Sequence, residues 1–169
     1  MKTWIVLLRA VNVGGTGKLP MAELRALCED AGFARVRTYI ASGNVVLRSA
    51  STARQVQETL QDALARHAGR QVGVLVRSTA EMRQVLADNP FPKAAPNRVV
   101  AIFLDRAPPA DALETVSGRK GEQLALGRRE IYVHYGDGMA DSKLKIPAAK
   151  TGTARNINTI IRLLEMANG

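Results

Sequence analysis

Hydrophobic and polar positions alternate in short blocks along the chain, and the blocks switch between the period of a strand and that of a helix. The first block, Thr3–Leu8, is apolar and rich in β-branched residues, which predicts a buried strand. Pro20 then fits the first position of a helix, and Gly32 fits the residue just after its end. Between them runs one apolar stripe, made of Met21, Leu24, Leu27, Cys28 and Ala31.

The rest of the first half continues this alternation. Ser51 or Thr52 can cap a second helix, which Gly69 ends. The other predicted strands of this half are Val36–Ile40, Asn44–Leu47 and Gln71–Arg77. The resulting order, β-α-β-β-α-β, is that of the ferredoxin-like split βαβ arrangement.

The second half begins in a similar order. Ser78 and Glu81 form a capping box that opens a third helix, and the proline-rich stretch 91–97 predicts a linker. Beyond it the pattern predicts strands at Arg98–Asp105, Gln123–Leu126 and Glu130–Tyr135, a short helix after Pro108-Pro109, and a last helix carrying Ile157, Ile160, Ile161 and Leu164. No strand follows that helix.

We therefore predict an α+β fold of two ferredoxin-like halves, the second incomplete, packed as one compact unit. Residues 1–90 form the first half with its connecting helix, and residues 97–169 form the second half with the C-terminal helix. A single mixed sheet with helices on one side is the alternative.

Composition narrows the class of protein. Of 169 residues, 46% are hydrophobic and 23% are charged, which is typical of a globular chain. The apolar runs are too short to cross a bilayer, and the start of the chain does not read as a signal peptide, so we expect a cytoplasmic protein that does not enter membranes. One cysteine and two distant histidines favour neither a disulfide nor a metal site, and we expect no cofactor.

The charge is unevenly distributed. The net charge is +9, which favours acidic partners. Three windows, 1–22, 31–57 and 142–164, contain no Asp or Glu but several cations. We predict that they meet in one positive cleft and bind an anionic small molecule or nucleic acid.

The first window contains a glycine turn directly after the first strand. Backbone amides of Gly14 and Gly15 near a helix start can point at an anion, with Lys18 as a point charge and Arg9 and Asn12 beside them. A phosphate-binding P-loop would need a glycine at position 12 and a hydroxyl at position 19, and the chain has Asn and Leu there. The turn therefore does not predict a nucleoside triphosphatase.

The other two windows supply hydrogen-bonding groups. Ser42 and Asn44 flank a tight turn that we expect to face the same opening. The last window packs polar groups in front of an apolar helix, where capping uses only one or two of them. An arginine at a helix start offers a bidentate fork for phosphate or carboxylate. The candidate binding residues of this window are Lys145, Arg155, Asn156 and Asn158.

These segments together resemble the family named for domain of unknown function 1697, a set of small bacterial α/β proteins. The matching stretches are Leu7-Leu8-Arg9, Asn12-Val13-Gly14-Gly15, Thr38-Tyr39-Ile40, Ser42-Gly43-Asn44-Val45, Ser142-Lys143-Leu144 and Arg155-Asn156. Ala10, Ala41 and Ile157 depart from the family pattern, the last by replacing a tryptophan. The resemblance implies an α/β fold with ferredoxin-like halves and brings no activity.

Three functions stay open on the sequence. The first is a binding module for a phosphate-bearing ligand, nucleotide or nucleic acid. Aromatic residues make up only 4% of the chain, which argues against base stacking but not against phosphate contacts. The second is an enzyme acting on a small phosphorylated or carboxylated substrate, for which no catalytic residue is evident. The third is a structural or interaction protein whose polar segments only hold the fold together.

Overall fold

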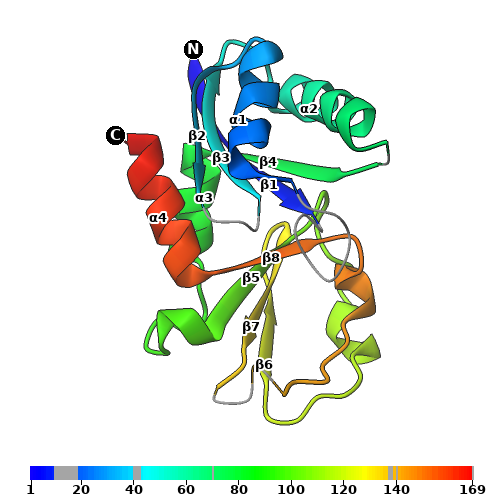
Figure 1. Ribbon diagram of the computed structural model, residues 1–169. Coiled ribbons are helices and arrows are strands. Elements are labelled where there is room, and N and C mark those ends of the chain that lie inside the picture. Colours follow the sequence, from blue (N-terminus) through cyan, green and yellow to red (C-terminus); the bar gives the residue numbers. More distant parts are fainter. Residues whose placement is uncertain (10–18, 40–42, 70, 137–138, 140, 169) are drawn as a thin grey trace. The chain divides into compact units, whose positions relative to one another are not determined.

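The computed structural model describes residues 1–9, 19–39, 43–69, 71–136, 139 and 141–168 (Figure 1). It divides into two units, one made of Met1–Met82 with Leu163–Gly169 and the other of Arg83–Arg162. Within the described residues there are two four-stranded antiparallel sheets and four α-helices, so the predicted α+β class is confirmed. The alternative of one mixed sheet is wrong.

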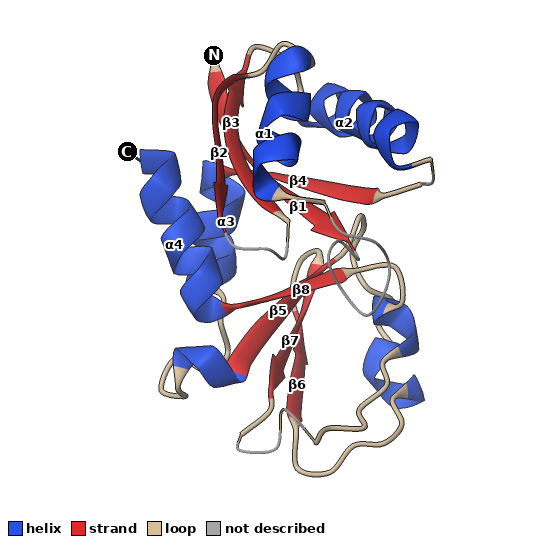
Figure 2. Cartoon of the chain, viewed as in Figure 1, coloured by secondary structure: helices blue, strands red, loops and turns tan. Residues whose placement is uncertain are grey.

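The first unit contains a sheet with strand order β2-β3-β1-β4. Its elements are β1 (Lys2–Arg9), α1 (Met21–Asp30), β2 (Ala34–Tyr39), β3 (Asn44–Ser49), α2 (Ala53–Ala68), β4 (Gly73–Ser78) and the start of α3 (Thr79–Ala87). Helices α1 and α2 cover one face of this sheet, as Figure 2 shows. Trp4, Val6 and Leu8 on β1 point into the core below them, together with Leu24 of α1 and Leu60 of α2.

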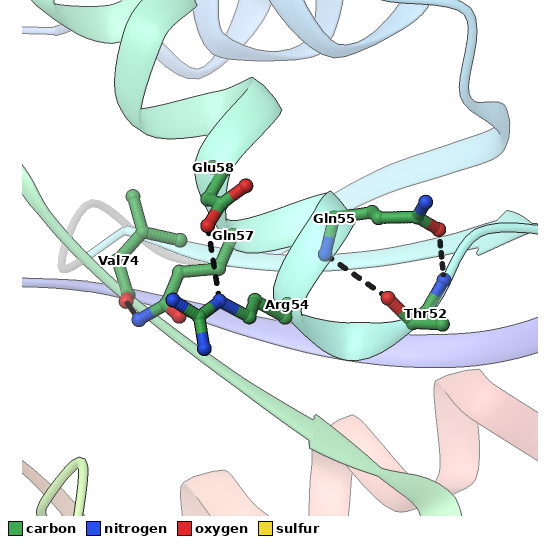
Figure 3. A network of polar contacts seen from close by, with 6 residues as sticks. All are labelled: Thr52, Arg54, Gln55, Gln57, Glu58 and Val74. Atoms are coloured by element: carbon green, nitrogen blue, oxygen red, sulfur yellow. Dashed lines mark hydrogen bonds and ion pairs between the residues drawn. The ribbon is translucent and has the colours of Figure 1, made fainter.

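Local signals explain where the second helix begins. The Thr52 hydroxyl accepts a hydrogen bond from the Gln55 amide, and the Gln55 side chain accepts one from the Thr52 amide, which closes a capping box (Figure 3). Gly69 ends the helix in a left-handed conformation. Gln57 donates from Nε2 to the carbonyl of Val74 at 2.7 Å and so ties the helix to β4.

The second unit has a sheet with strand order β6-β7-β5-β8, and every neighbouring pair is antiparallel. Its strands are β5 (Val99–Phe103), β6 (Gln123–Leu126), β7 (Glu130–His134) and β8 (Thr153–Asn156), and helix α4 (Ile157–Asn168) follows. Three short 3-10 helices, η1 (Pro96–Arg98), η2 (Ala112–Thr115) and η3 (Pro147–Ala149), lie in its connections. One face of the sheet packs against apolar side chains from the segments around η2 and η3.

Strand β8 corrects the prediction for the second half. We expected no fourth strand, because no strand pattern follows the last helix and residues 153–156 carry polar side chains. The structure places the fourth strand before that helix, where it pairs with β5 from Phe103↔Thr153 to Val100↔Asn156. The sequence hides the strand because its two inward positions are Thr153 and Arg155. The second sheet is therefore complete.

The described residues contain neither a membrane-spanning helix nor a cluster of metal-binding side chains. Within the described residues, none of the helices combines the length and the apolar character of a membrane span. In the same part of the chain, His, Cys, Asp and Glu side chains do not gather in groups of three that could hold a metal ion.

Candidate anion-binding site

Two predicted site residues lie at one end of the first sheet. Arg9 is the last residue of β1 and pairs with Gly73, and Asn44 is the first residue of β3 and pairs with Leu7. Asn44 is fully buried, and its Nδ2 donates to the carbonyl of Tyr39 at 2.9 Å. Arg9 and Asn44 therefore lie at the ends of adjacent strands.

Five other predicted residues cannot be placed. Asn12, Gly14, Gly15, Lys18 and Ser42 lie outside the described residues. The meeting of the three carboxylate-free windows in one cleft therefore stays a prediction.

Arg155 is held inside the fold. Its side chain is only 6% exposed, and its Nη1 donates to Thr153 Oγ1 at 2.6 Å and to the carbonyl of Ala154 at 2.9 Å. Burial lowers the pKa of its guanidinium from 12.5 to about 10, so the group keeps its charge at neutral pH. Nη1 of Arg155 therefore donates its hydrogen bonds to residues of its own strand, β8.

The neighbours of Arg155 differ in exposure. Asn156 ends β8, and its Oδ1 accepts a hydrogen bond from the Thr159 amide at 2.8 Å, so it caps helix α4. Asn158 is exposed in the first turn of that helix. Lys145 has an exposed side chain, and its backbone exchanges two hydrogen bonds with Ser117.

The bridge between Ser117 and Lys145 joins two loops of the second unit, and these loops enclose a pocket that the sequence did not predict. One loop precedes β6 and the other follows β7. The pocket measures about 720 Å³, within the range of small-molecule sites. We call it the loop pocket, and it is lined by Gly118, Arg119, Lys120, Gly121, Glu122, Tyr135, Gly136, Asp141, Ser142 and Lys143.

Glu122 is the buried centre of the loop pocket. Its Oε1 accepts a hydrogen bond from the Lys120 amide at 2.8 Å, and its Oε2 accepts one from the Ser142 hydroxyl at 3.0 Å. Burial raises the pKa of this carboxyl, but these two hydrogen bonds, one from its own amide and the nearby Arg119 charge outweigh burial and leave the pKa lowered. The carboxylate is therefore ionised and engaged by donors.

Three cations line the loop pocket together with this carboxylate. Arg119 donates from Nε to the carbonyl of Glu122 at 2.8 Å, which fixes its guanidinium beside the pocket. Lys120 and Lys143 are exposed, and neither forms an ion pair with another described residue. Asp141, also exposed, is the other carboxylate of the lining. The loop pocket therefore offers positive charge to a ligand.

Gly118 makes the close approach of the two loops possible. It has φ +68°, and a Cβ atom there would lie 2.0 Å from the carbonyl oxygen of Lys143. Tyr135 supplies a half-buried phenol on the other wall, and burial, followed by the charge of Glu122, raises its pKa. The signal that could have indicated this site was the run Gly118 to Glu122, two glycines around two cations before a buried acid.

Comparisons with known proteins support the family and the fold. A family profile described as "Protein of unknown function (DUF1697)" matches residues 1–132. The structure of a protein titled "conserved bacterial protein SP0830 from Streptococcus pneumoniae" is similar to this chain at 26% sequence identity. The TM-score is 0.79, and the match covers 98% of both chains. Among curated protein sequences, none matches this chain.

Proposed function

The chain belongs to the DUF1697 family, and we propose that it binds a phosphate-bearing anionic ligand in the loop pocket. The observation that carries this proposal is the arrangement of Arg119, Lys120 and Lys143 around a concave pocket whose buried carboxylate is already engaged by donors. Phosphate groups are bound in proteins by such clusters of cations and backbone amides. A nucleotide of ordinary size suits a pocket of about 720 Å³.

Nucleic acid is the second candidate. The net charge of +9 and the three windows without carboxylates favour a polyanion, whose phosphates would contact cations over a larger surface. The predicted residues Lys145 and Asn158 belong to the second unit, as the loop pocket does, and would then extend the contact beyond the pocket. The two candidates differ in salt dependence, because only the polyanion releases many counterions on binding.

The test is a calorimetric titration of the purified chain with inorganic pyrophosphate, with a nucleoside diphosphate and with a single-stranded oligonucleotide. The double variant Lys120→Ala/Lys143→Ala should lose at least about tenfold in affinity for pyrophosphate, which corresponds to about 1.4 kcal/mol. The matched control is Lys93→Ala, an exposed lysine outside the loop pocket, which should bind as the wild type does. Equal affinities of all three proteins would contradict the proposal.

The salt series separates the candidates. Oligonucleotide binding that falls by orders of magnitude between about 50 and about 200 mM salt, without saturable pyrophosphate binding, would favour the nucleic-acid function. Pyrophosphate binding with a shallow salt dependence would favour the small ligand.

We also propose that both units are ferredoxin-like, with the end of α4 from Leu163 onward belonging to the first unit and not, as predicted, to the half 97–169. The support is the strand order, which in both sheets places the first strand between the third and the fourth. The single buried thiol of Cys28 suits a reducing compartment, in keeping with a cytoplasmic protein.

A further inference from the structure

The two sheets share one pairing scheme, so positions in one unit have equivalents in the other. Val6 pairs with Val45 and Val76, and Ile102 pairs with Ile131 and Ala154 in the same way. Three residues further along the third strand of each sheet, the partners on the second strand are Ala34 and Gln123. Strand β2 has a register shift between Ala34 and Arg37, and beyond this shift the residues just before the two partners, Phe33 and Glu122, occupy matching places.

Local backbone geometry agrees with this equivalence. Phe33 follows Gly32, which has φ +96°, and Glu122 follows Gly121, which has φ +97°. Both side chains are buried, at 8% and 5% exposure. Phe33 belongs to the hydrophobic core of the first unit. The second unit thus places a carboxylate where the first unit places an aromatic ring.

Burying a carboxylate costs folding free energy unless its oxygens accept hydrogen bonds. Glu122, in the place that Phe33 has in the first unit, therefore destabilises the second unit unless it forms hydrogen bonds with neighbouring groups. Glu122 does so through three of its atoms. Oε1 binds the Lys120 amide, Oε2 binds the Ser142 hydroxyl, and the main-chain oxygen binds Arg119 Nε. Ser142 in turn accepts a hydrogen bond from the Leu144 amide at 3.3 Å, which orders the chain around Lys143.

We infer that Glu122 is the positioning residue of the loop pocket: it joins the two loops and sets the places of Arg119, Lys120 and Lys143 toward an anionic ligand. This inference rests on the proposed function for the identity of the ligand, whereas the joining of the loops stands independently. Glu122 does not act on the ligand itself, because its carboxylate oxygens are directed to Lys120 and Ser142.

The charged and titratable groups that face Glu122 come from both loops. Arg119 and Lys120 lie on its own loop, and Tyr135, Asp141 and Lys143 lie on the other. Of these groups, the charge of Arg119 favours the carboxylate and lowers its pKa. Tyr135 stays a neutral phenol at ordinary pH because its pKa is raised. The order of the two loops should therefore persist at neutral pH and fail only in acid, when Glu122 takes up a proton.

The decisive variant is Glu122→Phe, which copies the residue that fills the equivalent position of the first unit. We expect it to fold, with unchanged amide protection in β5 and β7. Protection of the Lys120 and Leu144 amides should fall at least tenfold, and pyrophosphate affinity should fall by a similar factor. The amide protection and the pyrophosphate affinity of Glu122→Gln should lie between those of the wild type and of Glu122→Phe, because an amide offers one acceptor oxygen in place of two.

Glu114→Gln is the matched control. It changes an exposed carboxylate of the second unit that lies outside the loop pocket, so both amides should keep their protection and pyrophosphate should bind as it does to the wild type. The protection of the Lys120 amide should also decline in acid for the wild type, at a pH below the ordinary range of a glutamate because the pKa of Glu122 is lowered, and show no such step in Glu122→Gln.

The outcomes separate this inference from the proposed function. The Glu122 variants could lose amide protection at Lys120 and Leu144 while the wild type binds no pyrophosphate. That result would contradict the proposed ligand and would still support the role of Glu122 in joining the two loops. Unchanged protection and unchanged affinity in both variants overturn the inference while the binding function stands. Should Glu122→Phe fail to fold, Glu122→Gln and its pH profile decide between these results.

Discussion

Arg77 and Arg155 occupy equivalent positions at the ends of the fourth strands of the two sheets. Arg77 pairs with Ile5 and Arg155 pairs with Ala101, each on the first strand of its sheet. Both side chains are buried, and each donates from Nη1 to the carbonyl of the residue before it. The residues that follow them, Ser78 and Asn156, cap the next helix in both units.

Shortening Arg155 should therefore destabilise the protein through lost packing and lost hydrogen bonds. We expect Arg155→Ala to lower the free energy of unfolding by roughly 2–4 kcal/mol. Arg155→Met should cost less than about 1.5 kcal/mol, because a long apolar chain refills the space and no charge has to be buried. Urea denaturation measures both values. Equal stability of the alanine and methionine variants would contradict this packing role of Arg155.

The adjacent asparagines give a second comparison. Asn156→Ala removes the cap of α4 and should lower the free energy of unfolding by about 1 kcal/mol, whereas Asn158→Ala changes an exposed side chain and should have almost no effect. The same two variants also probe the predicted anion site. If pyrophosphate or oligonucleotide affinity falls in Asn158→Ala, that residue takes part in binding rather than in folding.

The first unit could be predicted well from the sequence because its buried positions are apolar. The apolar, β-branched run Thr3–Leu8 and the stripe of α1 predicted the right elements, and Thr52 and Gly69 predicted the ends of α2. The second unit was harder. Strand β8 buries a threonine and an arginine, and such a pattern indicates a polar loop unless the hydrogen bonds of Arg155 are known.

The loop pocket could not be predicted for a different reason. Its loops are joined by a side-chain hydrogen bond between Glu122 and Ser142, residues 20 positions apart, and by the backbone bridge of Ser117 with Lys145. Neither contact leaves a periodic pattern in the sequence. The predicted helix after Pro108 is also only the 3-10 turn Ala112–Thr115, which lengthens the irregular region that shapes the pocket.

Gly118 and Gly121, two of the glycines that line the loop pocket, should respond differently to substitution. In Gly118→Ala the new methyl group would meet the Lys143 carbonyl oxygen, so the loops must separate, at a cost of at least about 2 kcal/mol. In Gly121→Ala nothing lies within 4 Å of the added atom, and only the left-handed backbone costs about 1 kcal/mol. Thermal unfolding and amide exchange at Ser117 and Lys145 measure the difference. Equal effects would contradict the described approach of the loops.

Cys28 should make the stability depend on pH in the alkaline range. Burial, and next the charge of Glu29, raise the pKa of its thiol from 9.0 to about 12. The unfolded chain therefore loses this proton first, so the contribution of Cys28 to stability is complete below pH 9 and is lost as the pH rises from 9 toward 12. The limiting slope is about 1.4 kcal/mol per pH unit.

The variant Cys28→Ala isolates this contribution. At neutral pH it should be less stable than the wild type by about 1 kcal/mol, because a small cavity replaces the sulfur. Above pH 9 the difference should shrink, since only the wild type carries the thiol. The native thiol should also resist alkylation at pH 8 until denaturant is added. Parallel stability curves from pH 7 to about pH 11 would show that the thiol is not buried as described.

Arg37 anchors the C-terminal helix to the first unit. Its Nη2 donates to the carbonyl of Met166 in the last turn of α4, and residues 163–169 belong with the first unit although they follow the second in sequence. A cation at a helix C-terminus also favours the helix dipole. We expect Arg37→Ala to lower the free energy of unfolding by about 1 kcal/mol and to speed amide exchange in residues 165–168. Arg35→Ala, an exposed arginine on the same strand, should leave that exchange unchanged. If both variants exchange alike, the last turn of α4 is held by its apolar side chains, and the arginine contributes nothing measurable.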